Sequence, residues 1–295
     1  MSETQVYIDG TFYPKSEAKI SVFDHGLLYG DGVFEGIRAY HGQVFLCREH
    51  IDRIYEGAHC LKIAIPYTKN EMRSILYECL KKNGVTDGYF RLIVTRGIGD
   101  LGLSPSKCKD KGTVICICAT ITLYPDSFYQ TGLPIITSAV PRSHPETLNP
   151  RVKSLNYLPN IMANIEASNA GVIEAVMLNH RGEISECTGD NIFIVKNGVL
   201  KTPPVSAVIL EGCTRNQVMK LAREAGIPVA EPTLCRYDLY TADECFLTGT
   251  AAELIPVISI DNRPIGNGKP GAMTADMLKR FRAFAAAYKD NAKWD

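Results

Sequence analysis

The chain lacks any long apolar run: no stretch is apolar for the roughly eighteen residues that a membrane span requires. Its first residues, Met-Ser-Glu-Thr-Gln-Val-Tyr, contain neither a basic segment nor an apolar stretch of signal-peptide length. It also lacks net charge, since 32 lysines and arginines balance 32 aspartates and glutamates, and no basic run is long enough to follow a phosphate backbone. We therefore expect a cytoplasmic protein that binds small molecules and neither a membrane nor nucleic acid.

Metal and redox motifs are absent as well. The six histidines show no metal-ligand spacing. The ten cysteines are scattered, and the one close pair, Cys116 and Cys118, alternates with isoleucine in a strand-like run. This spacing fits neither a zinc site nor a redox Cys-x-x-Cys motif. We expect reduced core cysteines and no metal, which makes a metal-dependent hydrolase a poor candidate.

The patterns that are present indicate an α+β protein of two domains. The chain has 295 residues, against about 150 per domain. Strands mixed with segregated helices favour an α+β layer over a doubly wound parallel sheet. The stretch 124–132 combines proline, glycine and polar residues between two apolar strands. We expect a first domain over 1–123, a linker over 124–132 and a second domain over 133–295, without an internal repeat.

Individual elements follow from the hydrophobic periods and the turn residues. In the first domain we expect strands over 6–9, 33–40, 43–46, 89–96 and 113–123, and helices over 48–61 and 70–82. In the second domain we expect a helix over 158–170, a meander of strands over 175–179, 183–187, 191–196 and 199–202, a helix over 214–225 and a strand over 245–247. Lys153 then lies in the connection before a helix.

Lys153 and Glu186 are candidates for chemistry. Val152, Leu155 and Tyr157 would partly desolvate the Lys153 amine, which favours its neutral, nucleophilic form. Glu186 ends a strand before a turn, so its side chain is placed to project into a cleft, where an anion would keep a pyridine nitrogen cationic. Asn191 follows this turn and would orient the contact. Solvated surface roles remain open for Lys153 and Glu186, and ordinary turn chemistry remains open for Asn191.

Two turns and one arginine are candidates for binding a phosphate. A Gly-Cys-Thr segment precedes an amphipathic helix, so backbone N–H groups and the helix dipole meet at Cys213 and Thr214, although an ordinary threonine N-cap also fits. Thr250 lies in a small-residue turn whose N–H groups suit an anion. Arg53 lies on the polar side of its helix, where a surface role is the alternative. An amine, a carboxylate and a phosphate cradle are what pyridoxal phosphate requires.

Tyr89 and Arg91 alternate with apolar residues, so the two polar side chains share one face of a strand. The planar fork of an arginine suits a substrate carboxylate, and a solvent-exposed strand face is the alternative. The glycine-rich stretch over 24–36 lacks the spacing of a nucleotide fingerprint. It indicates only that the backbone passes close to another group.

Together, these segments resemble the branched-chain amino acid aminotransferases, which are fold type IV pyridoxal phosphate enzymes. The match runs over nearly the whole chain. It is carried by Tyr-Gly-Asp-Gly-Val-Phe-Glu-Gly-Ile-Arg at 29–38, Tyr-Phe-Arg at 89–91 leading to Val-Thr-Arg-Gly at 94–97, Val-Lys-Ser-Leu-Asn-Tyr at 152–157, Glu-Ile-Ser-Glu at 183–186 and Gly-Thr-Ala-Ala-Glu at 249–253.

The resemblance implies a two-domain fold like that of D-amino acid aminotransferase, with a small α/β N-terminal domain and a larger β-rich C-terminal domain. It implies pyridoxal 5′-phosphate as cofactor and transamination between leucine, isoleucine or valine and 2-oxoglutarate, in branched-chain amino acid biosynthesis or degradation. The reaction would be ping-pong through a Schiff base, an aldimine, at Lys153. Because Tyr29 typically reaches the neighbouring subunit's site in this family, at least a homodimer is implied.

The resemblance also distributes roles among single residues. Lys153 is the implied catalytic residue, Tyr157 contacts the cofactor's phenolic oxygen, and Glu186 pairs with the ring nitrogen. Arg91 would accept the distal carboxylate of glutamate. The cofactor-binding set is Arg53, Lys153, Tyr157, Glu186, Asn191, Cys213, Thr214 and Thr250. The substrate-binding set is Tyr29, Phe34, Gly36, Tyr89, Arg91, Tyr124, Thr250 and Ala251.

The chain departs from the family pattern at two positions. Asp190 stands where glutamate is more frequent, and Cys187 stands where a small residue is usual; both bear on local tuning. D-amino acid aminotransferase and aminodeoxychorismate lyase share the lysine and glutamate but usually differ at the 250–252 turn and the 89–91 strand, which favours the L-branched-chain interpretation. An inert cofactor-binding or ligand-binding module, with Lys153 merely structural, is the alternative from another class.

Overall fold

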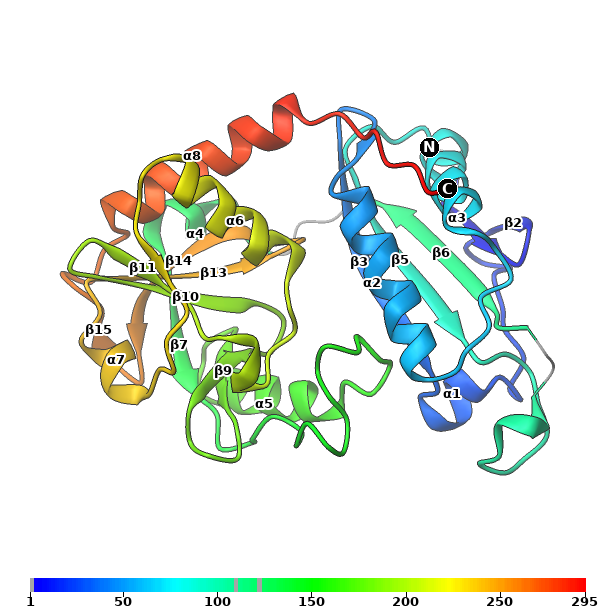
Figure 1. Ribbon diagram of the computed structural model, residues 1–295, viewed down its shortest axis with the longest axis horizontal. Coiled ribbons are helices and arrows are strands. Elements are labelled where there is room, and N and C mark those ends of the chain that lie inside the picture. Colours follow the sequence, from blue (N-terminus) through cyan, green and yellow to red (C-terminus); the bar gives the residue numbers. More distant parts are fainter. Residues whose placement is uncertain (1–2, 109–110, 121–123) are drawn as a thin grey trace. The chain divides into compact units, whose positions relative to one another are not determined.

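The computed structural model describes residues 3–108, 111–120 and 124–295. The chain divides into two compact units (Figure 1). Unit 1 comprises Met1–Ile121, Val152–Asn156 and Ala285–Asp295, and unit 2 comprises Thr122–Arg151 and Tyr157–Phe284. The domain boundaries expected from the sequence stay a prediction. The expected linker over 124–132 contains a short helix, α4 (Asp126–Thr131).

Unit 1 is built on one antiparallel sheet with the strand order β2-β1-β6-β5-β3-β4. Its strands are β1 (Gln5–Ile8), β2 (Thr11–Pro14), β3 (Gly32–Tyr40), β4 (Gln43–Val44), β5 (Gly88–Thr95) and β6 (Val114–Ala119). Its helices are α1 (His25–Tyr29), α2 (Cys47–Cys60) and α3 (Lys69–Asn83), with a short 3-10 turn at Pro105–Lys107. The predicted strand over 113–123 includes residues 121–123, which lie outside the described part of the chain.

Alternation along β5 gives the sheet of unit 1 two different faces. Phe90, Leu92 and Val94 are fully buried and pack in one core with α2 and α3, where each large apolar side chain contributes roughly 1.5–3 kcal/mol. Tyr89 and Arg91 alternate with them and are only partly buried. The face of β5 opposite the α2 and α3 side therefore carries the polar pair, as the sequence predicts.

The boundaries of α3 show why the helix predictions succeed. Thr68 and Glu71 form a capping box at its start, where each side chain bonds the other's backbone N–H. Gly84 ends the helix at φ 60°, a left-handed conformation that glycine adopts without strain. The predicted helix over 70–82 and its stop at 83–84 are confirmed.

Unit 2 contains a mixed sheet with the order β12-β11-β10-β13-β14-β7-β8-β9, to which β15 adds beside β14. Its strands are β7 (Leu133–Thr137), β8 (Ala175–Leu178), β9 (Ile184–Cys187), β10 (Asn191–Lys196), β11 (Val199–Lys201), β12 (Val229–Ala230), β13 (Glu244–Gly249), β14 (Glu253–Ile260) and β15 (Arg263–Pro264). Its other helices are α5 (Leu158–Asn169), α6 (Cys213–Glu224), α7 (Arg236–Tyr240) and most of α8 (Ala272–Ala287), with a 3-10 turn at Val205–Ala207.

The predicted meander over 175–202 is wrong at its centre. β8 pairs with β9 and β10 pairs with β11, both antiparallel, but β10 pairs with β13 instead of β9. A tight turn, closed by a 2.8 Å bond from Cys187 N–H to the Asp190 carbonyl, separates the two hairpins. Local alternation predicts each hairpin, but it carries no information about the distant strand that completes the pairing.

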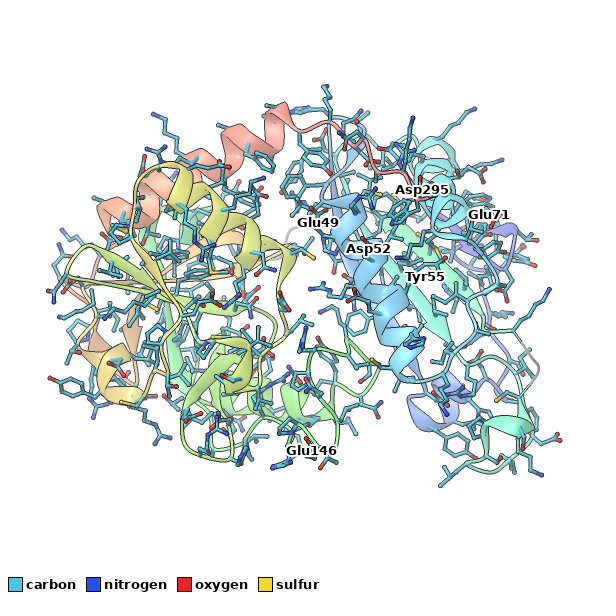
Figure 2. The ribbon with its side chains drawn as sticks, viewed as in Figure 1. Glu49, Asp52, Tyr55, Glu71, Glu146 and Asp295 are labelled. Carbon is cyan, nitrogen blue, oxygen red and sulfur yellow. The ribbon has the colours of Figure 1, made fainter. Side chains whose placement is uncertain are left out.

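The last residues of the chain pack on unit 1. Trp294 Nε1 donates to Asp52 Oδ1 at 2.6 Å, and Ala292 is buried. Figure 2 labels Asp52 on α2 and the terminal residue Asp295. Asp290 accepts from Arg73 Nε of α3 at 2.7 Å. The core of unit 1 therefore includes residues from both ends of the sequence. In the described part of the chain, no helix is both long and apolar enough to cross a membrane.

Candidate active site

Lys153 belongs to unit 1, where its backbone is attached to β3. Ser154 forms an isolated antiparallel bridge with Val33, and Phe34 N–H donates to the Lys153 carbonyl at 2.9 Å. The Lys153 amine lies 4.8 Å from the centre of the Phe34 ring. A cation–π contact at this distance holds the amine over an apolar surface. The segment that carries the candidate catalytic lysine is thus fixed by strand-like pairing.

Four predicted substrate-binding residues lie together on β3 and β5. The Arg91 guanidinium carbon lies 4.6 Å from the centre of the Phe34 ring, and Arg91 Nη2 donates to the Tyr89 hydroxyl at 3.1 Å. Gly36 lies opposite Arg91 in the strand pairing. A Cβ added at Gly36 would come within 2.1 Å of the Tyr89 hydroxyl, so any larger residue there would displace the Tyr89 side chain. Phe34 therefore contacts two cations, one at Arg91 and one at Lys153.

Tyr29 lies at the end of α1 and is 37% exposed. Its hydroxyl accepts from Gly102 N–H at 3.0 Å, and its ring packs edge-on against His25. These contacts tie Tyr29 to the loop after β5. Its predicted role in a neighbouring subunit stays a prediction.

Arg53 projects from α2 into a buried ion pair with Glu35 of β3. Arg53 Nε and Nη2 donate to the two Glu35 oxygens at 2.6 and 2.8 Å, and His50 Nδ1 lies 2.8 Å from Glu35 Oε2. Burial alone would raise the pKa of Glu35, but Arg53 and His50 outweigh it and lower this pKa to about 2. Because the folded pKa lies below the ordinary 4.5, the pair stabilises the fold above about pH 4.5. That contribution is lost as the pH falls towards 2.

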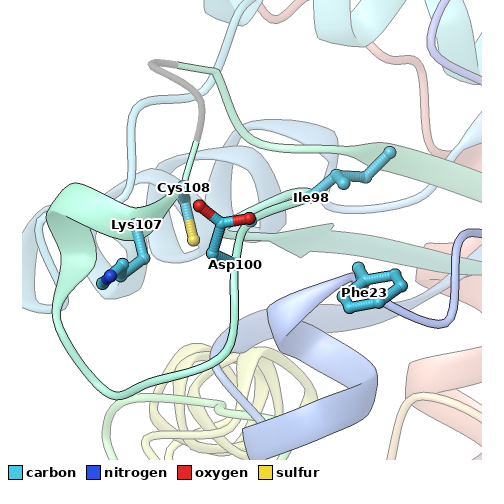
Figure 3. A pocket seen from close by; sticks show the side chains of 6 residues that line it. Phe23, Ile98, Asp100, Lys107 and Cys108 are labelled. Carbon is cyan, nitrogen blue, oxygen red and sulfur yellow. The ribbon is translucent and has the colours of Figure 1, made fainter.

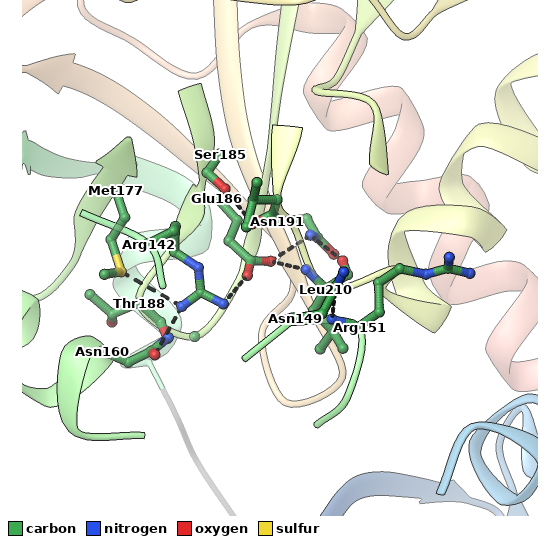
Figure 4. Close-up of polar contacts among 12 residues, drawn as sticks. Arg142, Asn149, Arg151, Asn160, Met177, Ser185, Glu186, Thr188, Asn191 and Leu210 are labelled. Atoms are coloured by element: carbon green, nitrogen blue, oxygen red, sulfur yellow. Dashed lines mark hydrogen bonds and ion pairs between the residues drawn. The ribbon is translucent and has the colours of Figure 1, made fainter. Parts of the chain in front are cut away.

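Glu186 lies on β9 in unit 2 and is buried, with both oxygens bound (Figure 4). Oε2 accepts from Asn191 Nδ2 and from Leu210 N–H, each at 3.0 Å. Oε1 lies 2.8 Å from Arg142 Nη2. Three donors converge on one carboxylate, which strongly favours its charged form. The structure thus places Asn191 beside Glu186, as the sequence predicts.

Arg142 is the residue that sequence reasoning missed. It follows β7 in a proline-containing stretch without helical or strand period, so no local signal marks it. The one general signal is that arginine is almost never fully buried unless it is paired. Arg142 is only 9% exposed, and its partner Glu186 is distant in sequence.

The first turn of α6 carries the predicted phosphate residues. Its N-cap is Gly212, which has no side chain to cap the helix, so an N-cap role for Thr214 is wrong. Cys213 and Thr214 are both buried in the first turn. A Cβ added at Gly212 would lie 2.0 Å from Asn191 Oδ1. The residue that orients Glu186 therefore also packs against the start of α6.

The second predicted phosphate turn follows β13. Thr250 and Ala251 are partly buried there, and the preceding Thr248 has a buried hydroxyl without a hydrogen-bond partner among the described residues. A Cβ at Gly249 would come within 1.9 Å of Asp190 Oδ1, so the turn lies against Asp190. As at Gly212, where Asn191 fills the space beside the backbone, glycine here lets a polar side chain pack directly against the turn.

Tyr124 lies beside this second turn, as a contact of Asp190. Its hydroxyl donates to Asp190 Oδ2 at 2.9 Å, and its ring is buried. Burial, then the Asp190 and Glu174 carboxylates, raise the pKa of Tyr124, so its proton stays in place. Burial likewise raises the pKa of the Cys187 thiol, which excludes a nucleophilic role near neutral pH.

Each unit by itself carries groups that suit pyridoxal phosphate by their chemistry. Unit 1 carries the Lys153 amine, the Arg53 guanidinium and the face with Tyr89 and Arg91. Unit 2 carries the bound carboxylate of Glu186 and two glycine-lined turns. This cofactor requires an amine for its aldehyde, a carboxylate that accepts from its ring nitrogen, and N–H donors for its phosphate.

The sequence profile of the family described as amino-transferase class IV matches residues 32–260. The chain belongs to this family. A Methanocaldococcus jannaschii protein named "Putative branched-chain-amino-acid aminotransferase" is 54% identical over 278 residues, covering 94% of this chain and 95% of that protein. The branched-chain-amino-acid aminotransferase of Escherichia coli (strain K12) is 34% identical, covering 98% and 96%.

Solved structures of branched-chain amino acid aminotransferases share the fold. The Escherichia coli enzyme has a TM-score of 0.93 at 33% identity, covering 98% of this chain and 97% of that chain. The Thermobaculum terrenum enzyme, solved in its PLP-form, has a TM-score of 0.87 at 28% identity, covering 97% and 94%. The expected fold type IV, α+β architecture is confirmed.

Proposed function

We propose that this class IV aminotransferase transfers amino groups between branched-chain L-amino acids and 2-oxoglutarate with pyridoxal 5′-phosphate as cofactor. The carrying observation is the Glu186 carboxylate, buried and bound by three donors, because a fixed anion is what a cationic cofactor ring requires. Relatives over 94% or more of the chain carry branched-chain aminotransferase names. A D-alanine aminotransferase from Listeria monocytogenes is also similar, at 35% identity.

When bound, the cofactor supplies an electron sink for charge that develops at the substrate's α-carbon. Glu186 would hold its ring nitrogen, with Asn191 orienting the carboxylate. Tyr157, the N-cap of α5, would donate to its phenolic oxygen. The phosphate would be held by the following groups of the two units: Arg53, the first turn of α6 at Cys213 and Thr214, and Thr250.

Lys153 would both hold the cofactor's aldehyde and move the proton of the reaction. Its Nζ would be the base that takes the proton from the substrate's α-carbon and delivers it to C4′ of the cofactor. The pairing of its segment with β3 holds the backbone in place, so the Lys153 amine would move through its side-chain torsions. The keto acid then leaves, and a second keto acid reverses the sequence, which gives ping-pong kinetics.

The face shared by β3 and β5 would bind the substrate side chain and set the specificity for it. Phe34 offers an apolar surface for leucine, isoleucine and valine, and Arg91 beside it offers a fork for the distal carboxylate of glutamate. Gly36 leaves the space that the Tyr89 hydroxyl occupies. The α-carboxylate would be held by the turn at Thr250 and Ala251, with help from Tyr89, and Tyr124 and Tyr29 would complete the pocket.

The proposed enzyme is a homodimer, in which Tyr29 would reach the active site of the neighbouring subunit. The surface around α1 supports it, because exposed apolar side chains gather on α1, on the chain before it and on the loop that bonds Tyr29. A pocket on this surface is lined in part by Phe23, Ile98 and Lys107 (Figure 3). The exposed apolar residues are Val22, Phe23, Leu27, Ile98, Leu101 and Leu103.

An assay with two amino donors tests the proposed function. With 2-oxoglutarate as acceptor, we expect turnover of L-leucine and none of D-alanine. The purified holoenzyme should be yellow and should lose that colour when L-leucine is added. Turnover of D-alanine alone would instead favour a D-amino acid aminotransferase, and an unchanged colour with every amino donor would favour an inert binding module.

Replacing Glu35 with glutamine is expected to weaken binding of pyridoxal phosphate roughly tenfold, because the charge that aligns Arg53 is lost. Binding of pyridoxal, which has no phosphate, should change little. Titration of the apoprotein with each compound, followed by absorbance, measures the difference. Glu49→Gln, an exposed position on the same helix as Arg53 (Figure 2), is the control. Equal weakening for both compounds would contradict a phosphate role for Arg53.

A further inference from the structure

Arg142 occupies a fixed position beside Glu186 (Figure 4). Its backbone N–H donates to the Leu178 carbonyl of β8 at 2.8 Å, so the residue runs alongside the strand that pairs with β9. Its Nη1 donates to Asn160 Oδ1 of α5 at 2.9 Å, and Asn160 Nδ2 donates to the Thr188 carbonyl at 2.7 Å. The backbone of Arg142 is therefore held by β8, and its guanidinium is held by Asn160 of α5, which in turn bonds the turn after β9.

Burying Arg142 at this position costs more free energy than burying an apolar side chain would. Arg142 Nε is buried without a hydrogen-bond partner among the described residues, and leaving a buried donor unpaired is destabilising. An apolar side chain would fill the same space without that penalty. What an apolar side chain cannot supply is a permanent positive charge 2.8 Å from Glu186 Oε1.

The charge of Arg142 acts on the proton that Glu186 would share with a cofactor nitrogen. One proton has two positions, on the ring nitrogen or on a Glu186 oxygen. With the proton on nitrogen, Arg142 faces a carboxylate; with the proton on oxygen, it faces a neutral acid. Since the attraction exists only in the first case, Arg142 favours the proton on nitrogen.

We propose that Arg142 is a positioning residue that keeps Glu186 anionic and thereby keeps the cofactor's ring nitrogen protonated. The inference deepens the proposed function and rests on it. Arg142 touches neither substrate nor cofactor in this proposal; it acts through Glu186. The contact with Asn160 also joins it to α5, which begins directly after Tyr157, so the same side chain aligns the residues expected at the ring nitrogen and at the phenolic oxygen.

Nitrogen NMR of the holoenzyme, loaded with pyridoxal phosphate labelled with ¹⁵N in the ring, reads the proton position directly. Arg142→Gln keeps a hydrogen-bond donor but removes the charge, and we expect the protonated-to-unprotonated ratio of the ring nitrogen to fall by a factor of about 10 to 1,000. Arg142→Lys keeps the charge and should retain the wild-type resonance. In each variant kcat should fall together with the protonated fraction of the ring nitrogen, while KM changes little.

Asn160→Ala is the matched structural control. It removes the contacts to Arg142 and Thr188 but leaves the Arg142 charge beside Glu186. We expect a lower melting temperature and an unchanged ring-nitrogen resonance. A wild-type resonance in Arg142→Gln, or an equal shift in Asn160→Ala, would overturn the proposal and leave the proposed function intact. Wild-type protein that binds no labelled cofactor would overturn the proposed function itself.

If Arg142→Gln does not fold, infrared spectroscopy tests instead whether Glu186 is a carboxylate in the wild-type holoenzyme. The difference spectrum between wild-type holoenzyme and Glu186→Gln isolates the Glu186 carboxyl group. The proposal requires carboxylate bands and no carboxylic-acid C=O band. A carboxylic-acid band in the wild type would refute it without any change at position 142.

Discussion

Replacing Lys153 with alanine is expected to lower the rate of leucine transamination by at least about 10²- to 10⁴-fold, the usual contribution of a positioned proton-transfer group. The loss is expected because no other side chain of the segment paired with β3 carries an amine. Small amines added to the solution should restore part of the rate, since they replace the missing base. Stopped-flow absorbance of the amino-donor half-reaction measures both effects.

The control for this substitution is Lys220→Ala, an exposed position on α6, which should retain wild-type activity. Borohydride reduction followed by peptide mapping gives independent information about the same amine. We expect the reduced cofactor on the peptide that contains Lys153. A label on another lysine, with activity kept in Lys153→Ala, would refute the assignment.

Glu186→Gln is expected to lower kcat by a factor of about 10 to 1,000. The glutamine can still accept from Leu210 N–H, but it brings no negative charge. An opposite charge in contact with a titrating group shifts its protonation equilibrium by about 10- to 1,000-fold, which sets the expected loss. The visible absorbance of the bound cofactor should change with it. Steady-state kinetics with L-leucine provides the measurement.

Glu183→Gln, on the same hairpin and paired with Arg181, separates loss of charge at Glu186 from general damage to β9. It should leave kcat unchanged. If Glu186→Gln keeps the wild-type kcat while its cofactor still binds, the carboxylate is not the partner of the ring nitrogen.

Local pattern predicted most of the fold that surrounds these residues. The helix around Ile51 and Ile54 and the shared face of Tyr89 and Arg91 follow from periods of 3.6 and 2 residues, which burial imposes on neighbouring positions. The same signal exists in α8, where Met277 and Phe281 are buried four residues apart, although no helix was predicted there.

Long-range contacts mark where prediction from sequence ends. The pairing of Ser154 with Val33 depends on a distant strand, and so does the contact of Arg142 with Glu186. Neither leaves a trace in local spacing, because the chain around each residue is irregular. The local sequence supplied Lys153 and Glu186 as candidates and the family resemblance gave them roles, whereas only the fold shows what holds each of them.

The chain passes between its two units at four points, since residues 152–156 and 285–295 belong with the N-terminal unit. Neither unit is therefore one continuous piece of polypeptide. A fragment that ends near residue 120 would lack the strand-like segment beside Val33 and the Trp294 anchor on α2. During synthesis on the ribosome, the N-terminal unit emerges first but cannot complete its core until residues 285–295 have also emerged, so its assembly must wait until nearly all of unit 2 has been made.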